Sequence, residues 1–336
     1  GYSEHYSLVS LEKYIFLMKD SGIFVASSPI RTEHAEVHGE YVMLENERFY
    51  KISNYDQFPA FFISLVSSGD HWMFISSNGA LTAGRKNPES ALFPYYTDDK
   101  IMDSPELSGS KSILKIERDG RQFLWEPFSE RYRGVYHTEN HLYKNRTGNK
   151  LWFEEINHDL GVSFKYMYSF ADEHGFVKRS VISNLWEVSL DVQVLDGLRN
   201  IMPYGVSSTL QNQRSTLADA YKRNELDQQT GLGIFSLSSM IVDKAEPSEA
   251  LRATGVFALG IKPDHYLLSS DQLWAFRRGE DIQTEHDVKA RKGAYYTIAK
   301  HKLQAGERKE WYTIADVDLG PAEFASIRTN IADPRA

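Results

Sequence analysis

Residues 76–101, SSNGALTAGRKNPESALFPYYTDDKI, gather side chains that could bind a polar ligand such as a sugar. Arg85 offers a planar fork of N–H donors that suits a carboxylate, a phosphate or a pair of hydroxyls. The side-chain amide of Asn78 both donates and accepts hydrogen bonds, as recognition of sugar hydroxyls requires. Gly79 and Gly84 allow positive φ angles and close approach of the backbone to a ligand. We therefore predict that this segment contributes to a binding site.

Three more residues complete the predicted site. Tyr95 and Tyr96 present apolar rings with polar tips, which suits the rim of a sugar pocket. Asp98 could orient the Arg85 guanidinium through an ion pair. The segment follows the period of neither a strand nor a helix, and long irregular loops in compact domains are usually functional or disordered. The alternative is an ordered loop that closes one end of the fold, with Arg85 paired to Asp98 or Asp99.

Carboxylates are the second kind of candidate, because cleavage of a glycosidic bond uses an acid together with a base or nucleophile. The sequence offers Asp98-Asp99, Glu154-Glu155 and Asp196. Neighbouring residues of a strand point to opposite faces, so neither doublet can act as a facing pair by itself. We expect Glu154-Glu155 at an exposed sheet edge and Asp196, followed by glycine, as a turn former. No catalytic residue is assigned.

His137 and His141, in HTENH, are the candidates for metal ligands. The surrounding residues resemble a strand or loop, and on a strand the two imidazoles would lie roughly 13 Å apart, too far for one ion. Cysteine is absent, which excludes thiolate ligands and disulfides. The phosphate-binding and dinucleotide-binding glycine motifs, HExxH and Gly-x-Ser-x-Gly are absent too. We predict neither a metal nor another cofactor.

The composition narrows the class of partner. The chain has 336 residues, 41% hydrophobic and 25% charged, which is the mixture of a globular protein with a sizeable core. A net charge of −8 argues against nucleic acid or an anionic membrane surface as a partner. No run reaches the roughly 18 apolar residues of a membrane span, and residues 1–22 lack a signal-peptide pattern. We expect a cytoplasmic protein, with the periplasm left open.

The side chains named above need a scaffold, and the pattern along the chain predicts a mainly β one. Short alternating runs such as GVSFKYMYSF and LWEVSLDVQVL are separated by tight turns, of which Asp119-Gly120 is the strongest hairpin signal. Many such runs with few helices between them favour antiparallel sheets in a large two-sheet assembly. Helices are predicted near the start, in residues 208–227 and after Gly320, where a proline suits the first helical turn.

The N-terminal domain of cellobiose- and chitobiose-phosphorylase-type enzymes contains two blocks that this sequence resembles, in WMFISSNGALTAGRKNPESALFPYYTDDKI and FVKRSVISNLWEVSLDVQVLDGLRNIMPYGV. The likeness extends from about Gly39 to about Ala325. It implies a galactose-mutarotase-like β-supersandwich over residues 1–318, with 1–22 as a helical lead-in, and the start of a helical linker over 319–336. In that family an (α/α)6 barrel follows and carries the general acid. The resemblance therefore implies a catalytic domain or subunit outside these residues.

The resemblance also bears on the binding site. Asn78, Arg85 and Asp98 are the positions that match the family's sugar-binding loop. Residues 84–101 are longer than the loop of the small phosphorylases, which favours a larger relative or another branch of carbohydrate-active proteins.

Three functions are consistent with these observations. In the leading one, the chain is the N-terminal sandwich portion of a glycoside phosphorylase or hydrolase, which binds an oligosaccharide or sugar phosphate without a complete active site of its own. The second is a self-sufficient mutarotase-like epimerase or lyase that uses a carboxylate with one of four histidines as acid and base; these are His71, His137, His141 and His158. The third is a non-catalytic carbohydrate-binding or assembly module, whose aromatic residues, 13% of the chain, form an interface.

Overall fold

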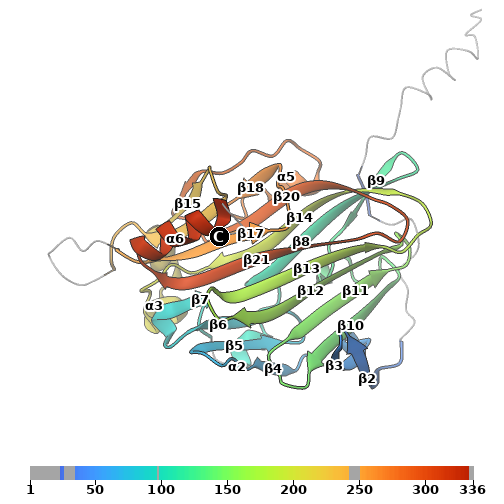
Figure 1. Ribbon diagram of the computed structural model, residues 1–336, viewed down its shortest axis with the longest axis horizontal. Helices are drawn as coiled ribbons and strands as arrows, with labels where there is room; N and C mark the ends of the chain where they lie inside the picture. The colour runs from blue at the N-terminus through green and yellow to red at the C-terminus, as the bar shows by residue number, and fades with distance from the viewer. Residues whose placement is uncertain (1–22, 26–34, 97, 242–249, 333–336) are drawn as a thin grey trace, which may run out of the picture.

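Two large β-sheets dominate the computed structural model shown in Figure 1, which describes residues 23–25, 35–96, 98–241 and 250–332. The strands pair almost throughout in antiparallel fashion, and neither large sheet closes into a barrel. The predicted fold, a mainly β antiparallel supersandwich with few peripheral helices, is confirmed. The predicted lead-in helix over residues 1–22 lies outside the described residues. Among the helices of the described part, none has the length and apolarity that a membrane crossing requires.

Three sheets are formed by the described residues. The six-stranded sheet has the order β1 (Ile23–Phe24), β9 (Arg121–Trp125), β8 (Gly109–Arg118), β14 (Leu190–Ile201), β20 (Gly293–Leu303) and β18 (His265–Leu267). The eleven-stranded sheet has the order β19 (Asp287–Lys289), β15 (Lys222–Asp227), β16 (Leu232–Leu237), β17 (Ala253–Leu259), β21 (Arg308–Leu319), β13 (Gly175–Asn184), β12 (Val162–Ala171), β11 (Leu151–Asn157), β10 (Thr138–Asn145), β3 (Glu47–Ser53) and β2 (His38–Leu44). The four-stranded sheet has the order β4 (Phe62–Leu65), β5 (His71–Ser76), β6 (Leu81–Arg85) and β7 (Ala91–Phe93).

The core lies between the two large sheets and follows the alternation of the strands. In β14, Val192 and Val194 face the core that also contains Phe164 of β12 and Trp311 of β21. The next residue, Leu195, faces the opposite side, where helix α5 (Leu273–Arg277) covers the six-stranded sheet. Both faces of this sheet are therefore buried, and each fully buried large apolar side chain contributes about 1.5–3 kcal/mol.

The turn and helix signals near the ends of these strands are confirmed. Arg118 pairs with Arg121 across the β8–β9 hairpin, and Asp119 and Gly120 both have positive φ, 50° and 74°, as a type I′ turn requires. Helix α6 (Pro321–Ala332) begins with its proline and packs Ile327 on the outer face of the eleven-stranded sheet. Its role as the beginning of a linker stays a prediction.

A helix is predicted over residues 208–227, and this is wrong for residues 222–227. The segment forms two short helices, α3 (Ser208–Gln213) and α4 (Ser215–Ala220), and then enters strand β15. The alternation of buried and half-buried residues along β15, at Lys222, Asn224 and Leu226 on the buried side, shows the period of a strand.

The prediction that residues 76–101 form an irregular loop is also wrong. They contain β6, the short 3-10 helix η2 (Pro88–Ser90), β7 and helix α2 (Asp98–Met102). Gly84 lies inside β6, where a Cβ atom would come within 2.4 Å of the Trp72 ring and 2.7 Å of the Ser90 carbonyl oxygen. This glycine therefore permits close packing inside a sheet and does not mark a loop.

Asp196 lies in the middle of β14 and is fully buried, so its prediction as a turn former is wrong. Its carboxylate accepts hydrogen bonds from Lys178 Nζ at 2.5 Å, Ser112 Oγ at 2.6 Å, and both Ser180 Oγ and Trp311 Nε1 at 2.8 Å. Burial lowers the pKa of Lys178, while the Asp196 carboxylate acts in the opposite direction. A buried ion pair with further hydrogen-bond donors thus joins the two large sheets.

Candidate functional site

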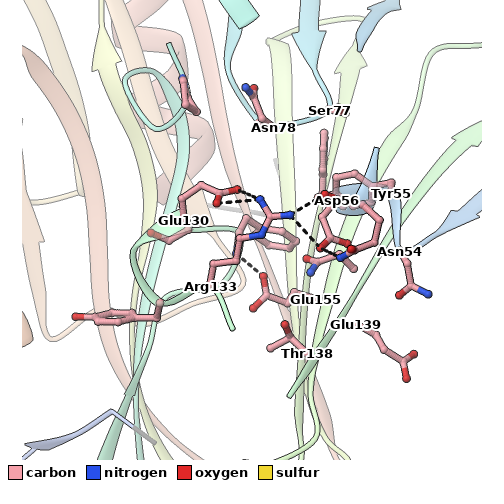
Figure 2. A pocket seen from close by; sticks show the side chains of 18 of the residues that line it. Asn54, Tyr55, Asp56, Ser77, Asn78, Glu130, Arg133, Thr138, Glu139 and Glu155 are labelled. Atoms are coloured by element: carbon pink, nitrogen blue, oxygen red, sulfur yellow. Dashed lines mark hydrogen bonds and ion pairs between the residues drawn. The ribbon is translucent and has the colours of Figure 1, made fainter. Parts of the chain in front are cut away.

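An open cavity of about 750 Å³ lies against the face of β11 and β12 that carries the core residues (Figure 2). One wall is residues 54–60, which include the 3-10 helix η1 (Tyr55–Gln57). The opposite wall is residues 125–137, which include the 3-10 helix η3 (Glu130–Tyr132). The turn at residues 77–79 closes one end. We call this cavity the cleft.

Aromatic rings form the inner wall of the cleft. Phe153 and Tyr166 stack with their centroids 5.1 Å apart, and Phe128 meets Tyr166 edge to face at the same distance. Tyr55 of η1 meets Phe153 edge to face at 5.9 Å. Phe153 and Tyr166 are paired in register on neighbouring strands, so the sheet itself fixes this stack. The cleft thus has a rigid apolar surface.

Glu155 is the ionisable group that this aromatic wall surrounds. It is only 7% exposed, and its two carboxyl oxygens accept hydrogen bonds from Trp125 Nε1 at 2.9 Å and from the Phe128 backbone N–H at 2.6 Å. Burial raises the pKa of Glu155 to about 7, with smaller contributions from the negative charges of Asp56 and Glu130, although both hydrogen bonds act to lower it. At neutral pH this carboxyl is therefore about half protonated and can donate as well as accept a hydrogen bond.

The backbone at Phe128 is held in an unusual conformation beside this carboxyl. Its φ of 61° lies in the left-handed region, which costs a bulky residue about 1–3 kcal/mol. That conformation points its N–H at the Glu155 carboxyl while the ring packs on Tyr166. Strain of this kind persists only where surrounding contacts enforce it, and it is frequent at functional sites.

Charged side chains line the outer rim. Figure 2 shows Arg133 between Glu130 and Asp56. Its Nη1 donates to both Glu130 carboxylate oxygens, at 3.2 and 3.1 Å, and its Nη2 donates to the Asp56 carbonyl oxygen at 2.9 Å. The Arg133 side chain is 53% exposed, so it can exchange these partners for a ligand at little cost.

A second carboxylate, Glu126, lines the same cleft but is held ionised. Its side chain is fully buried, which alone would raise the pKa, but Arg277 at 2.6 Å and Lys111 at 2.7 Å outweigh burial and lower the pKa. Glu155 has no such cation among its hydrogen-bond donors. One cleft thus holds two carboxyls whose environments shift their pKa values in opposite directions, as acid–base chemistry requires.

Of the five predicted site residues, Asn78 lines the cleft. Its amide is engaged locally, because Nδ2 donates to the Met102 carbonyl oxygen and Oδ1 accepts from the Ala80 N–H. Arg85 lies at the end of β6, outside the cleft lining. Asp70 at 2.7 Å and Asp316 at 3.1 Å hold its guanidinium, the task predicted for Asp98.

The other predicted residues lie near Arg85 in sequence but do not line the cleft. Tyr95 packs edge to face against Trp72 at 5.7 Å, and its backbone N–H donates to Gln211. Tyr96 is half-buried, and burial raises its pKa. Asp98 is the first residue of α2, and its side chain lies outside the described part of the chain. A role for these residues in binding stays a prediction.

The sequence contained a signal for Glu155 that the prediction of an exposed edge missed. In β11, Leu151 and Phe153 are the apolar residues in phase with Glu155, and both face the core. β11 is paired on both sides, with β10 and β12, so it is not an edge strand. The alternation alone could have placed Glu155 inside.

One of the four candidate histidines, His137, lines the cleft, and its ring lies 4.7 Å from that of His158. His141 lies in β10, as expected for a strand, where burial lowers its pKa. His71 lies beside Arg85, and burial lowers its pKa too. Among the described residues no cluster of His, Asp and Glu could hold a metal ion.

Neither a protein-family model nor a curated protein matches the sequence. Solved structures with a similar arrangement of strands include a polysaccharide lyase, with a TM-score of 0.43 and 10% identity over 82% of this chain and 34% of the lyase. A candidate aldose 1-epimerase from Klebsiella pneumoniae has a TM-score of 0.32 and 7% identity, with 89% of this chain and 92% of that protein covered. A candidate kojibiose phosphorylase from the human microbiome has a TM-score of 0.29 and 10% identity, with 82% and 28% covered.

This chain therefore spans about a third of the length of that lyase. The similar structures are carbohydrate-active enzymes with sandwich-like folds. At these identities and TM-scores the likeness assigns no activity to this chain, and the specific resemblance to cellobiose and chitobiose phosphorylases stays a prediction.

Proposed function

We propose that the cleft binds a carbohydrate chain and that this polypeptide is the β-sandwich unit of a carbohydrate-active enzyme. The observation that carries the proposal is Glu155, a carboxyl with a pKa of about 7, buried in an aromatic wall that opens into a cavity of about 750 Å³. This volume is within the range of sites for small ligands, about 300–1,000 Å³.

The two surfaces of the cleft suit the two surfaces of a sugar. A pyranose ring has apolar C–H faces, which pack on rings such as Phe128 and Tyr166, and a belt of hydroxyls at its edge. The hydroxyls need partners that both donate and accept hydrogen bonds, and Glu155 does both near neutral pH. Arg133 and Asp56 at the rim add a donor fork and an acceptor.

The proposed role is binding and positioning, with the bond-breaking machinery completed by a further catalytic domain or subunit such as an (α/α)6 barrel. Glu155 would hold a sugar hydroxyl or ring oxygen, and its proton would be available at neutral pH for transfer. Whether the enzyme is a phosphorylase or a hydrolase depends on which nucleophile that further part presents.

Titration of the isolated chain with neutral gluco-oligosaccharides, followed by calorimetry and by NMR, tests the proposal. We expect weak binding, with the resonances of cleft residues shifting, and no phosphorolysis or hydrolysis of the sugar. Glu155→Gln should weaken binding about 10-fold, because a hydrogen bond to a buried acid is worth about 1.5 kcal/mol.

Glu154→Gln is the matched control. This residue is adjacent to Glu155 in β11 but points to the other face, where it accepts a hydrogen bond from the Tyr143 hydroxyl at 2.5 Å. Its variant should bind as the wild type does. Equal weakening by both substitutions, or binding that leaves the cleft resonances unmoved, would reject the cleft as the sugar site.

A further inference from the structure

Arg199 lines a second and smaller cavity, of about 20 Å³, next to the cleft. This smaller cavity shares Asn78, Gly79, Glu106, Phe128 and Tyr166 with the cleft and is otherwise lined by Pro127, Arg199 and the β8 residues Ser110, Lys111 and Ser112. A space of this size holds one water molecule or one oxygen atom of a ligand. We call this space the inner pocket.

Among the described residues, the Arg199 guanidinium has no hydrogen-bond acceptor. Its side chain is 14% exposed, and its Nε is buried with no partner. The nearest carboxylate oxygen, Glu106 Oε2, lies 3.9 Å from Nη1, which is beyond a hydrogen bond. Burial lowers the pKa of Arg199, although an arginine remains charged.

The neighbouring carboxylates are already engaged with other donors. Glu106 accepts from Lys111 Nζ at 2.9 Å, from Ser129 Oγ at 2.6 Å and from the Glu130 N–H at 2.9 Å. Burial acts to raise the pKa of Glu106, but Lys111, the Ser129 hydroxyl and the more distant charge of Arg199 outweigh it and bring the pKa to about 2.

Lys111 also forms an ion pair with Glu126. The Glu126 carboxylate contacts Arg277 as well and, at 3.8 Å, Arg131. The buried cations Lys111, Arg277 and Arg199 thus outnumber the two carboxylates by one. Arg199 is the cation left without a close partner. A buried charge without a close counter-charge destabilises the fold unless a bound ligand supplies that counter-charge.

The Tyr166 hydroxyl is the second donor without a partner at the inner pocket. The described residues provide it with no hydrogen bond, while its ring is fixed by the stack on Phe153. Gly79, with a φ of 84°, lies next to it, and a Cβ atom there would be 3.7 Å from the hydroxyl oxygen. That distance is an ordinary contact, so the positive φ, rather than a lack of space, accounts for the glycine.

We propose that the inner pocket binds an oxyanion, with Arg199 as the charged donor and the Tyr166 hydroxyl as the neutral one. The inference rests on the proposed function of the cleft and adds the class of sugar: an acidic one whose carboxylate oxygen enters the inner pocket while its ring packs on the aromatic wall. Inorganic phosphate carries the same chemistry and is the other possible source of the oxyanion.

The test compares a neutral cello-oligosaccharide with the same oligosaccharide oxidised at C6 to glucuronic acid, and includes inorganic phosphate alone. The wild type should bind the oxidised sugar at least about 10-fold more tightly, because a hydrogen bond to a charged group is worth about 1.5–3 kcal/mol. Arg199→Gln should abolish that preference and leave the neutral sugar's affinity unchanged. Arg291→Gln, which removes an exposed arginine paired with Asp271, should leave the preference intact.

Tyr166→Phe provides a second variant in case Arg199→Gln fails to fold, since it keeps the ring and removes the hydroxyl alone. It should reduce the preference several-fold. Phosphate binding that depends on Arg199, without a preference between the two sugars, would assign the pocket to free phosphate.

The outcomes separate the two proposals. Equal affinity for both sugars without Arg199-dependent phosphate binding overturns the oxyanion site and leaves sugar binding standing. A preference that survives Arg199→Gln overturns the oxyanion site as well. If neither sugar binds, the cleft proposal fails, and the phosphate arm alone then decides whether Arg199 binds an oxyanion.

Discussion

Glu155 should make the stability of the protein depend on pH between about 4.5 and 7. Its pKa in the folded state is about 7, against an ordinary value of 4.5. A carboxyl with a raised pKa binds its proton more tightly when the protein is folded, so the folded state is favoured at low pH. The contribution is fully present below about pH 4.5 and is lost as the pH rises through 7. The difference in pKa corresponds to about 3 kcal/mol of unfolding free energy.

The substitution Glu155→Gln isolates this contribution because the amide does not titrate. It also has a cost that does not change with pH. Trp125 Nε1 and the Phe128 N–H both donate to the carboxyl, whereas an amide offers one acceptor oxygen, so one donor loses its partner at about 1–3 kcal/mol. We therefore expect the variant to have a lower free energy of unfolding than the wild type at pH 5. The difference should shrink or vanish by pH 8.5, because the wild type loses the contribution of its protonated carboxyl.

Urea unfolding at several pH values from 5 to 8.5 measures the effect as the difference in unfolding free energy between wild type and variant. Carboxylates with lowered pKa values, such as Glu106 and Glu45 at about 2, lose their stabilising contribution only as the pH falls below about 4.5, outside this range. Glu154→Gln is again the control and should show no such slope. A constant difference between Glu155→Gln and wild type across the range would refute the buried, half-protonated carboxyl.

Two further predictions follow from the core and the cleft. Lys178→Met leaves the buried Asp196 carboxylate without its cation and should lower the free energy of unfolding by about 3–5 kcal/mol, measured by urea denaturation. A decrease below about 1 kcal/mol would contradict a paired charge between the two large sheets. His137→Ala tests the epimerase alternative. We expect that the isolated chain does not accelerate the interconversion of sugar anomers, as followed by polarimetry. Acceleration by the wild type that disappears in His137→Ala would support the epimerase over our proposal.

Local signals were sufficient for the features whose energetics are local. The hairpin at Asp119-Gly120 needs only two residues that accept positive φ, and helix α6 begins at a proline, which suits the first helical turn. The mainly β class came from alternation along each strand, which reflects a half-buried surface whatever the partner strand is.

Signals that depend on neighbours were misinterpreted for a physical reason. Glycine was taken to mark turns, but Gly197 lies inside β14, where a Cβ atom would come within 1.9 Å of the Tyr295 carbonyl oxygen on β20. Residues 81–85 and 91–93 are short strands that pair irregularly, and a few residues do not establish a period. The sugar-binding role of Asn78, Arg85, Tyr95, Tyr96 and Asp98 depended on that interpretation.

The amino-acid sequence by itself determined that this protein is a large antiparallel β structure without cysteine chemistry, because alternation, turn residues and composition act within a few positions of the chain. Only the tertiary structure decided which ionisable groups are perturbed. Glu155 meets Trp125 from 30 residues away. Within the described residues, Arg199 has only the distant Glu106 carboxylate, because Lys111 binds both Glu106 and Glu126. A pKa depends on burial and on nearby charges, and both arise only when distant strands pack together.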